Sequence, residues 1–209
     1  MELFLNDIFL SFQGETSRTG FPSLFIRLAG CNLNCSYCDT PEAKIKKKKV
    51  HVKELLSKIK SYQPFDHLTI TGGEPLQQKN IYLLFTALLK EKNKIQLETN
   101  GSFSLEKVPK EIIKIVDIKT PSSTEESSFL FENLNYLSHN DEIKFVLVDN
   151  KDYLFAKKFI KKFLANYKGV INFSPVRGKF DPKILAQKIL KDNLLVRLNL
   201  QLHKIIEIK

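Results

Sequence analysis

The only three cysteines of the chain lie close together, at Cys31, Cys35 and Cys38. The spacing C-x3-C-x2-C puts three thiolates on one short loop, where they can bind a single metal centre. Structural zinc sites take four protein ligands, and disulfides use cysteines in pairs. Three thiolates instead leave one iron of a cubane [4Fe–4S] cluster without a protein ligand, open to an exogenous sulfonium cofactor. The motif therefore favours an iron–sulfur cluster.

Two other interpretations of the motif stay open at this point. The chain has four histidines, so a Cys3His zinc site is compatible with the residue count. Three unrelated buried thiols are the other alternative, although unrelated cysteines rarely cluster on one loop and are absent elsewhere.

Arg27 and the segment Gly72-Gly73-Glu74 carry further chemistry. The two glycines allow a ligand to approach the backbone closely, and Glu74 offers a carboxylate to an ammonium group. Arg27 interrupts an apolar run in a chain with only four arginines. A charge on a half-buried strand is costly unless it is paired, and guanidinium pairs bidentately with carboxylate. We therefore expect Arg27 either to form a structural ion pair or to bind a substrate carboxylate.

Length and composition predict one globular domain, residues 1–209, in the cytoplasm. The chain is 43% apolar, without a long apolar run or a secretory leader pattern, and clustered free thiols suit a reducing compartment. The net charge is +10, but only four of the 33 basic residues are arginine, so we expect neither a nucleic-acid nor a membrane partner. The run Lys46–Lys49 predicts a solvated loop, or alternatively a patch that steers anionic ligands.

Apolar runs of strand length alternate with helical periodicity from residue 23 onward. The predicted strands are Ser23–Leu28, His67–Thr71, Lys94–Thr99, Ile115–Lys119, Glu142–Val148, Val170–Phe173 and Leu194–Leu200. Apolar residues at helical spacing predict helices around residues 55–59, 81–89, 155–164 and 184–189. This alternation predicts an α/β fold with a parallel sheet and right-handed crossovers. About six βα units fall short of the eight in a complete barrel, so an incomplete βα barrel is expected.

In such folds the functional residues lie at the carboxyl ends of the strands. The cysteine loop follows the first predicted strand, and Gly72-Gly73-Glu74 follows the second. Thr99-Asn100, Lys119 and Ser174 follow the third, fourth and sixth strands. These motifs are therefore expected to meet at one rim.

Several segments together resemble a known family. They are Phe12-Gln13-Gly14-Glu15, Phe25–Leu33, Tyr37 before the last cysteine, Cys38-Asp39-Thr40, Thr71–Pro75, Leu97–Gly101, Pro121-Ser122-Ser123 and Gln201–Lys204. On these segments the chain resembles, nearly end to end, the 7-carboxy-7-deazaguanine synthase family of the radical S-adenosylmethionine (SAM) superfamily. The resemblance implies an incomplete barrel of the radical SAM type, with Cys31, Cys35 and Cys38 holding the cluster.

The resemblance also implies roles for other residues, and it assigns none of them as a conventional catalytic nucleophile. SAM is expected to contact Tyr37, Asp39, Gly73, Glu74, Asp117, Ile118, Lys119, Phe173, Ser174, Pro175 and Val176. The substrate is expected to contact Phe12, Gln13, Gly14, Glu15, Arg27, Thr71, His203 and Lys209. Thr40 is expected to bind Mg²⁺. The family usually has Ser-Pro-Lys where this chain has Asp117-Ile118-Lys119, so Lys119 is the residue that carries over directly.

The implied reaction converts 6-carboxy-5,6,7,8-tetrahydropterin into 7-carboxy-7-deazaguanine with loss of ammonia, a step toward queuosine and related deazapurines. The reduced cluster would donate an electron to SAM and give a 5′-deoxyadenosyl radical that takes hydrogen from C6. A flavodoxin-like or other electron donor and a homodimer are expected. The alternatives are a glycyl-radical-enzyme activase, which needs a surface groove for a peptide, and a basic zinc-binding nucleic-acid module, which would be colourless and iron-free.

Overall fold

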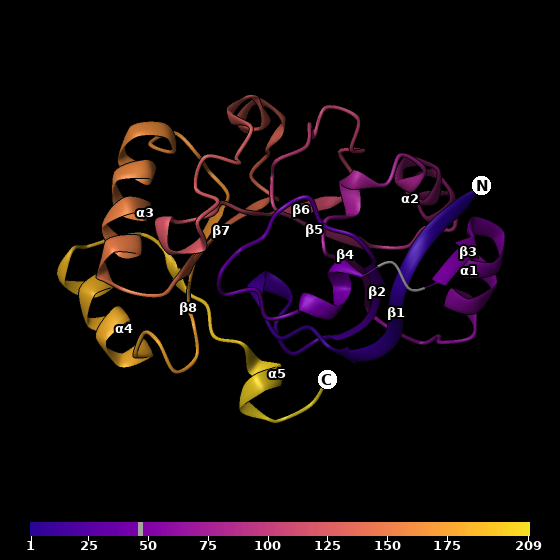
Figure 1. Ribbon diagram of the computed structural model, residues 1–209, viewed down its shortest axis with the longest axis horizontal. Helices are drawn as coiled ribbons and strands as arrows, with labels where there is room; N and C mark the ends of the chain where they lie inside the picture. Colours follow the sequence, from indigo (N-terminus) through magenta and orange to yellow (C-terminus); the bar gives the residue numbers. More distant parts are fainter. Residues whose placement is uncertain (46–47) are drawn as a thin grey trace.

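One mixed sheet of nine strands runs through residues 1–45 and 48–209, the part of the chain that the computed structural model describes. The strand order is β3-β1-β2-β4-β5-β6-β7-β8-β9, so β3 and β9 are edges and the sheet does not close within this part (Figure 1). The strands are β1 Glu2–Phe12, β2 Pro22–Leu28, β3 Lys48–His51, β4 His67–Gly72, β5 Ile95–Thr99, β6 Ile113–Asp117, β7 Glu142–Leu147, β8 Val170–Pro175 and β9 Arg197–Leu198. The α/β fold with an incomplete barrel is confirmed.

The strands from β2 to β9, apart from β3, pair in parallel. Apolar residues at matching register positions build the core, as Leu24, Leu68 and Ile95 do on three adjacent strands. All seven predicted strands are present, although β6 begins and ends two residues earlier than expected. The last strand is only Arg197–Leu198, because the chain turns inward at Asn199, whose side chain donates to Ser174 Oγ at 2.8 Å.

The sequence patterns did not predict the two antiparallel strands at the N-terminal side of the sheet. β1 pairs with β2 and also with β3, and a register shift between Leu5 and Asp7 disturbs the alternation of its apolar residues. Lys48 and Lys49 belong to β3 and not to a solvated loop, while Lys46 and Lys47 lie outside the described residues. Lysines on an edge strand keep it soluble while Val50 faces the core.

In the described part of the chain, four helices cover the outer face of the sheet and a fifth lies near the chain end. The helices are α1 Val52–Lys60, α2 Ile81–Lys90, α3 Asn150–Phe163, α4 Pro182–Lys191 and α5 Leu202–Ile205. In Figure 1, α1 and α2 lie at the right and α3 and α4 at the left. The described connections from β5 to β6 and from β6 to β7 contain no α-helix, only turns and short 3-10 segments such as Pro121–Ser123. The expected alternation of strands and helices is therefore interrupted at the middle of the sheet.

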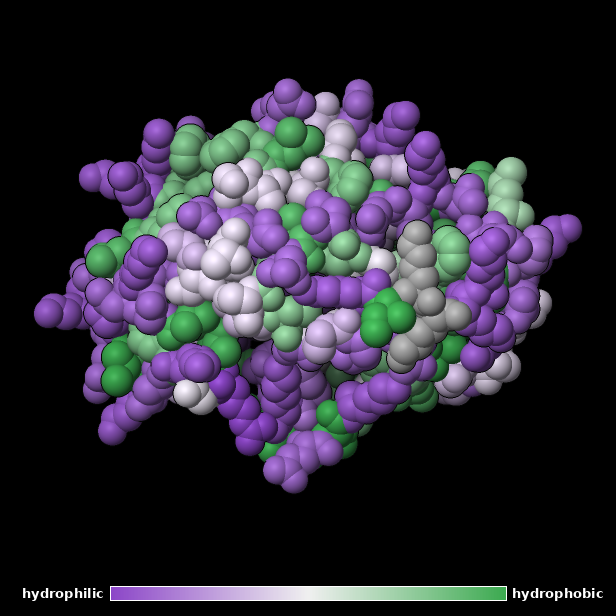
Figure 2. All heavy atoms as spheres, viewed as in Figure 1, coloured by the Kyte–Doolittle hydropathy of each residue, from purple (hydrophilic) through white to green (hydrophobic). Residues whose placement is uncertain are grey.

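No helix of the described part is both long enough and apolar enough to cross a bilayer. Figure 2 shows hydrophilic side chains over all parts of one face of the molecule, interrupted by small apolar groups. On this face the polar residues do not gather into one stripe.

A short polar segment, the turn Thr16–Arg18 with the preceding residues 13–15, occupies the inside of the curved sheet. The 3-10 turn Thr16–Arg18 follows β1, and its Thr16 has a left-handed backbone with φ of 67°. Thr16 N donates to Asn199 Oδ1 at 2.8 Å, and its hydroxyl accepts from Gln96 Nε2 at 3.0 Å. Ser17 N donates to Glu142 Oε1 at 2.9 Å. These contacts with β5, β7 and the segment after β9 fix the position of the preceding residues, 13–15.

Candidate active site

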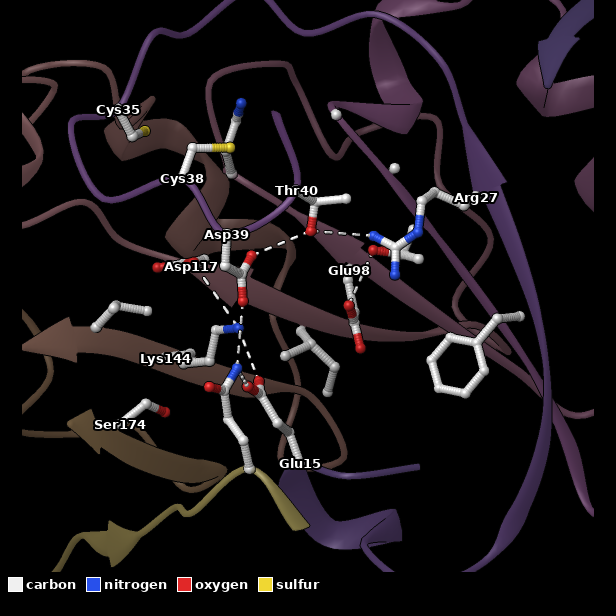
Figure 3. A pocket seen from close by; sticks show the side chains of 18 of the residues that line it. Glu15, Arg27, Cys35, Cys38, Asp39, Thr40, Glu98, Asp117, Lys144 and Ser174 are labelled. Carbon is white, nitrogen blue, oxygen red and sulfur yellow. Dashed lines mark hydrogen bonds and ion pairs between the residues drawn. The ribbon is translucent and has the colours of Figure 1, made fainter. Parts of the chain in front are cut away.

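A cavity of about 910 Å³ opens at the carboxyl ends of the central strands (Figure 3). The cysteine loop forms one side of the cavity, and residues of the C-terminal segment form another. The residues expected from the sequence that line it are Phe12, Gln13, Glu15, Arg27, Cys31, Cys35, Tyr37, Cys38, Asp39, Thr40, Thr71, Gly73, Asp117, Lys119, Ser174, Pro175, Val176, His203 and Lys209. The structure therefore brings together residues that are almost 200 positions apart in the sequence.

Four residues expected in the site do not line the cavity. Glu74, Ile118 and Phe173 are fully buried behind its wall. Gly14 is also buried, and it lies against His203 of the C-terminal segment. Ile118 and Phe173 thus contribute to the core beneath the site, with their side chains outside the cavity.

The cysteine loop begins just after β2 and is tied to neighbouring loops by hydrogen bonds. Ser36 N donates to Ser123 O at 3.1 Å, and Asn34 N donates to Glu125 Oε1 at 2.6 Å. Cys31 and Cys35 are half-buried and Cys38 is exposed, and all three are free thiols. Burial is the main cause that raises the pKa of Cys31 and of Cys35, so these thiols are protonated at neutral pH when nothing binds them.

The three cysteine side chains are not preassembled into a metal site. Among residues 1–45 and 48–209, no group of three or more His, Cys, Asp or Glu side chains is gathered closely enough to hold a metal ion. The donor set nevertheless fits a cluster with one open iron, because three thiols of one loop border a single cavity. Figure 3 shows Cys35 and Cys38 at the same end of the pocket as Asp39.

The Gly72-Gly73-Glu74 segment packs directly on the start of the cysteine loop. Glu74 N donates to Gly30 O at 2.8 Å, and a Cβ on Gly73 would lie 2.3 Å from that same oxygen and 2.7 Å from Cys31 Cβ. A side chain at position 73 is therefore excluded by the backbone of the cysteine loop. The glycine is needed for this close approach between two chain segments.

The Glu74 carboxylate points away from the cavity, in contrast to the expected contact with an ammonium group. It is completely buried, and it accepts hydrogen bonds from Leu76 N at 2.9 Å, Thr99 Oγ1 at 2.9 Å and Asn100 N at 2.7 Å. Burial raises its pKa, and these donors oppose that rise. Glu74 thus joins the end of β5 to the loop after β4 and positions both.

Arg27 forms no ion pair with any residue that the structure describes. It projects from β2 into the cavity, where Nη1 donates to Thr40 Oγ1 at 3.4 Å. Its guanidinium carbon also lies 5.8 Å from the centre of the Phe9 ring. Of the two interpretations of Arg27, the structural ion pair is therefore excluded within this part of the chain, and its cationic group faces the cavity.

Sequence reasoning missed several charged residues that line the cavity, among them Glu98 on β5 and Lys144 on β7. Glu98 accepts from Thr71 Oγ1 at 2.9 Å and from Gln13 Nε2 at 3.2 Å. Burial raises the pKa of Glu98, and the nearby Glu15 carboxylate adds to the rise while Lys144 opposes it. A signal was present in the sequence, because each residue is a charge inside a predicted buried strand.

Side chains of alternating charge form a row of ion pairs along the bottom of the cavity. Lys144 Nζ lies 2.9 Å from Glu15 Oε2 and 3.8 Å from Asp117 Oδ2, and Lys119 Nζ lies 3.0 Å from the latter oxygen. Burial lowers the pKa of Lys144, but the carboxylates of Glu15, Asp117 and Glu98 outweigh burial and raise it well above its usual value. Lys144 is therefore a permanent cation in this site.

The C-terminal segment, residues 201–209, borders the cavity opposite the strand ends. Leu202 N donates to Gly14 O at 2.8 Å, and Lys204 Nζ pairs with Asp39 Oδ2 at 2.8 Å. At the end of the segment, Lys209 Nζ pairs with Asp7, and its carbonyl accepts from the Ser11 hydroxyl. His203 and Lys209 thus line the cavity, although they follow the last strand of the sheet.

Comparison with known proteins identifies the family. The family profile of the Radical SAM superfamily matches residues 25–124. The 7-carboxy-7-deazaguanine synthase of Koribacter versatilis is 39% identical over 97% of this chain and 96% of its own length. The synthase of Clostridium acetobutylicum is 41% identical over 95% of this chain and 93% of its own length. The chain belongs to the 7-carboxy-7-deazaguanine synthase family.

Solved structures support the same fold. The crystal structure of QueE from Escherichia coli matches 97% of this chain and 95% of its own chain with a TM-score of 0.81 at 24% identity. The structure of Streptococcus suis SuiB bound to precursor peptide SuiA has a TM-score of 0.58, and the match covers 46% of that chain. The near full-length relatives favour membership of the synthase family over the activase and zinc-module alternatives.

Proposed function

We propose that this member of the family is a radical SAM lyase that converts 6-carboxy-5,6,7,8-tetrahydropterin into 7-carboxy-7-deazaguanine with loss of ammonia. The observation that carries the proposal is that Arg27, a guanidinium without a carboxylate partner in the described structure, faces the same cavity as the cysteine triad. The near full-length similarity to 7-carboxy-7-deazaguanine synthases supports this choice of substrate and product. The product lies on the route to queuosine and related deazapurines.

The radical SAM family implies a [4Fe–4S] cluster and SAM. Cys31, Cys35 and Cys38 would hold the cluster, which when bound supplies an electron to SAM and thereby a hydrogen-abstracting radical. The cofactor side of the cavity presents Tyr37, Asp39, Gly73, Asp117, Lys119, Ser174, Pro175 and Val176. Asp117 Oδ1 is buried without a hydrogen-bond partner among the described residues, which suits a donor such as a ribose hydroxyl.

The substrate side of the cavity matches a carboxylated pterin. Arg27 offers two parallel N–H donors to a carboxylate. Glu15 and Glu98 are acceptors for the 2-amino group and ring N–H of a pterin, and both lie within the cavity. Phe12, Gln13, Gly14, Thr71, His203 and Lys209 complete this side by lining it or by supporting the residues that do. These residues bind and orient the substrate and exclude water.

The proposal also includes a Mg²⁺ ion on the Thr40 hydroxyl. Magnesium keeps an octahedral oxygen shell and accepts a single protein ligand when substrate and water supply the rest. The position of Thr40 beside Arg27 supports the magnesium role, because a carboxylate on Arg27 would also reach an ion on Thr40.

Further parts of the proposal are one domain over residues 1–209, a homodimer in the cytoplasm, a flavodoxin-like or other electron donor, and no nucleic-acid partner.

The proposal is tested on protein purified without oxygen. We expect a brown protein with iron and sulfide in cluster stoichiometry, and conversion of the carboxypterin that depends on SAM and a reductant. Cys35→Ala should lose the cluster absorption and all turnover while its far-ultraviolet circular dichroism stays that of the parent. Colourless protein with stoichiometric zinc, or an iron-loaded protein that cleaves SAM but leaves the carboxypterin unchanged, would overturn the proposal.

A further inference from the structure

Lys144 bridges two carboxylates that come from different sides of the cavity. It projects from β7 between Glu15, which follows β1, and Asp117, which ends β6 (Figure 3). Asp117 and Lys144 are also direct partners in the parallel ladder between β6 and β7, so their backbones are fixed side by side. A single ammonium group thus lies within 4 Å of both carboxylates.

The two carboxylates differ in what surrounds them. The other oxygen of the Glu15 carboxylate, Oε1, accepts from the neutral amide of Gln201 at 2.7 Å. Asp117 has a second cation, Lys119, at 3.0 Å, and its Oδ1 is buried without a hydrogen-bond partner among the described residues, free for the proposed SAM contact. Glu15 therefore belongs to the substrate side of the site and Asp117 to the cofactor side, with Lys144 at the junction.

The positive charge of Lys144 is needed to balance the carboxylates that surround it. Glu15, Glu98 and Asp117 all line one partly closed cavity, where their negative charges repel one another. No lysine or arginine other than Lys144 lies within ion-pair distance of Glu15 in the described part of the chain. Removing the ammonium group would leave Glu15 uncompensated and Asp117 with only Lys119.

We propose that Lys144 is a positioning residue that couples the binding of SAM to the binding of the pterin, because it holds the acceptors for both ligands in place. This inference rests on the proposed function. The strands fix the backbones of Asp117 and Lys144, so what a ligand can still restrict is the side chains: a ligand that fixes the Glu15 carboxylate also restricts the Lys144 ammonium group and, through it, the Asp117 carboxylate, and the second ligand then has less side-chain entropy to remove. The coupling must be reciprocal, so each ligand raises the affinity for the other by the same factor.

The experiment measures this coupling directly on cluster-loaded protein. Calorimetry without reductant, which prevents turnover, gives the SAM affinity with and without the carboxypterin, and the carboxypterin affinity with and without SAM. In the parent we expect each ligand to tighten the other about fivefold or more. Lys144→Met should weaken both ligands by about tenfold or more and reduce the coupling factor to about one. Lys144→Arg, which keeps the charge, should restore most of the coupling.

Lys114→Met is the matched control for loss of a buried lysine. Lys114 is 3% exposed, pairs with Asp141 at 3.1 Å and lies near the start of β6, away from the cavity lining. This variant should keep both affinities and the coupling.

If Lys144→Met does not fold, Glu15→Gln tests the same coupling between the two ligands, because SAM affinity should then no longer respond to the carboxypterin.

The outcomes separate this inference from the proposed function. A parent that binds both ligands independently, or a Lys144→Met variant that keeps the coupling factor, overturns the role of Lys144 and leaves the proposed function intact. A cluster-loaded parent that does not bind the carboxypterin overturns the proposed function itself.

Discussion

Arg27 Nη1 donates to Thr40 Oγ1 across 3.4 Å, and the same hydroxyl donates to Asp39 Oδ1 at 3.1 Å (Figure 3). The hydroxyl thus connects the end of β2 to the loop that leaves the cysteine motif. The bond from Arg27 is long for a guanidinium donor, so a carboxylate can replace it with a shorter, charge-assisted one. A substrate carboxylate at this place would meet Arg27 and an ion on Thr40 together.

Arg27→Lys tests the recognition of that carboxylate. Lysine keeps the positive charge but cannot form two parallel hydrogen bonds, so we expect kcat/KM for the carboxypterin to fall by about 10- to 100-fold. SAM cleavage without substrate should change little, because Arg27 reaches Asp39, a residue proposed for SAM, only through the Thr40 hydroxyl, which keeps its own bond to Asp39. Steady-state kinetics with both reactions followed in parallel measures the difference.

Arg18→Lys is the control for this prediction, since Arg18 pairs with Asp66 at 3.3 Å outside the cavity. It should leave both reactions unchanged. If Arg27→Lys turns over the carboxypterin as the parent does, Arg27 does not bind the substrate.

Thr40→Ala and Thr40→Ser together test the proposed magnesium ligand. The alanine variant loses the oxygen that would bind the ion, so most of the stimulation of turnover by Mg²⁺ should disappear. The serine variant keeps a hydroxyl at the same place and should keep the stimulation. Turnover is measured across a magnesium titration and with a chelator. An alanine variant that responds to Mg²⁺ like the parent would show that Thr40 only links Arg27 to Asp39.

The parallel part of the fold was predictable because strands buried on both faces carry apolar runs that local patterns detect. The antiparallel β1 was not, because the register shift between Leu5 and Asp7 disturbs its alternation and its pairing with β3 brings together distant residues. The length of β9 also depends on distant contacts, since Asn199 leaves the sheet to bond with Ser174 and Thr16.

The candidate site was predictable where residue types form local motifs, as the three cysteines do. Lys144 lacks such a motif, and Glu98 lies in the segment Leu97–Gly101 without being singled out; the roles of both depend on side chains that other parts of the chain place beside them. Glu74 shows the opposite case: its motif indicated a ligand contact, but the fold uses both of its oxygens to hold backbone N–H groups. A motif gives the position of a residue near a site, while the direction of the side chain is set by tertiary contacts.

Glu98→Gln should stabilise the cluster-free protein at neutral pH. Burial raises the pKa of Glu98 above its ordinary value of 4.5, so between 4.5 and the higher value the folded chain binds more protons than the unfolded chain. Stability contributed by this group therefore falls as pH rises through that window, and glutamine removes the penalty. We expect Tm to rise by roughly 2–4 °C at neutral pH, the effect of about 1 kcal/mol in a chain of this size.

The advantage of Glu98→Gln should shrink at about pH 4, where the carboxyl of the parent is protonated in both states. Thermal unfolding at the two pH values measures this difference, with the exposed Glu111→Gln as the control that should show none. A variant that is less stable than the parent at neutral pH would contradict this account of Glu98. The same variant should bind the carboxypterin more weakly, because the amide no longer offers a charged acceptor.

Gly14→Ala should detach the C-terminal segment from the site. A Cβ at position 14 would lie 1.9 Å from His203 Nδ1 and 2.8 Å from its Cγ, so the ring cannot stay where it is. Because Leu202 N donates to Gly14 O directly beside this contact, moving the ring also strains that bond. We expect amides of residues 202–208 to lose protection in hydrogen exchange and the affinity for the carboxypterin to fall by about tenfold.

The double variant Gly14→Ala/His203→Ala removes the ring that causes the clash and should recover the protection, though not the substrate affinity. Unchanged protection in Gly14→Ala would mean that the segment packs on the site without depending on this glycine.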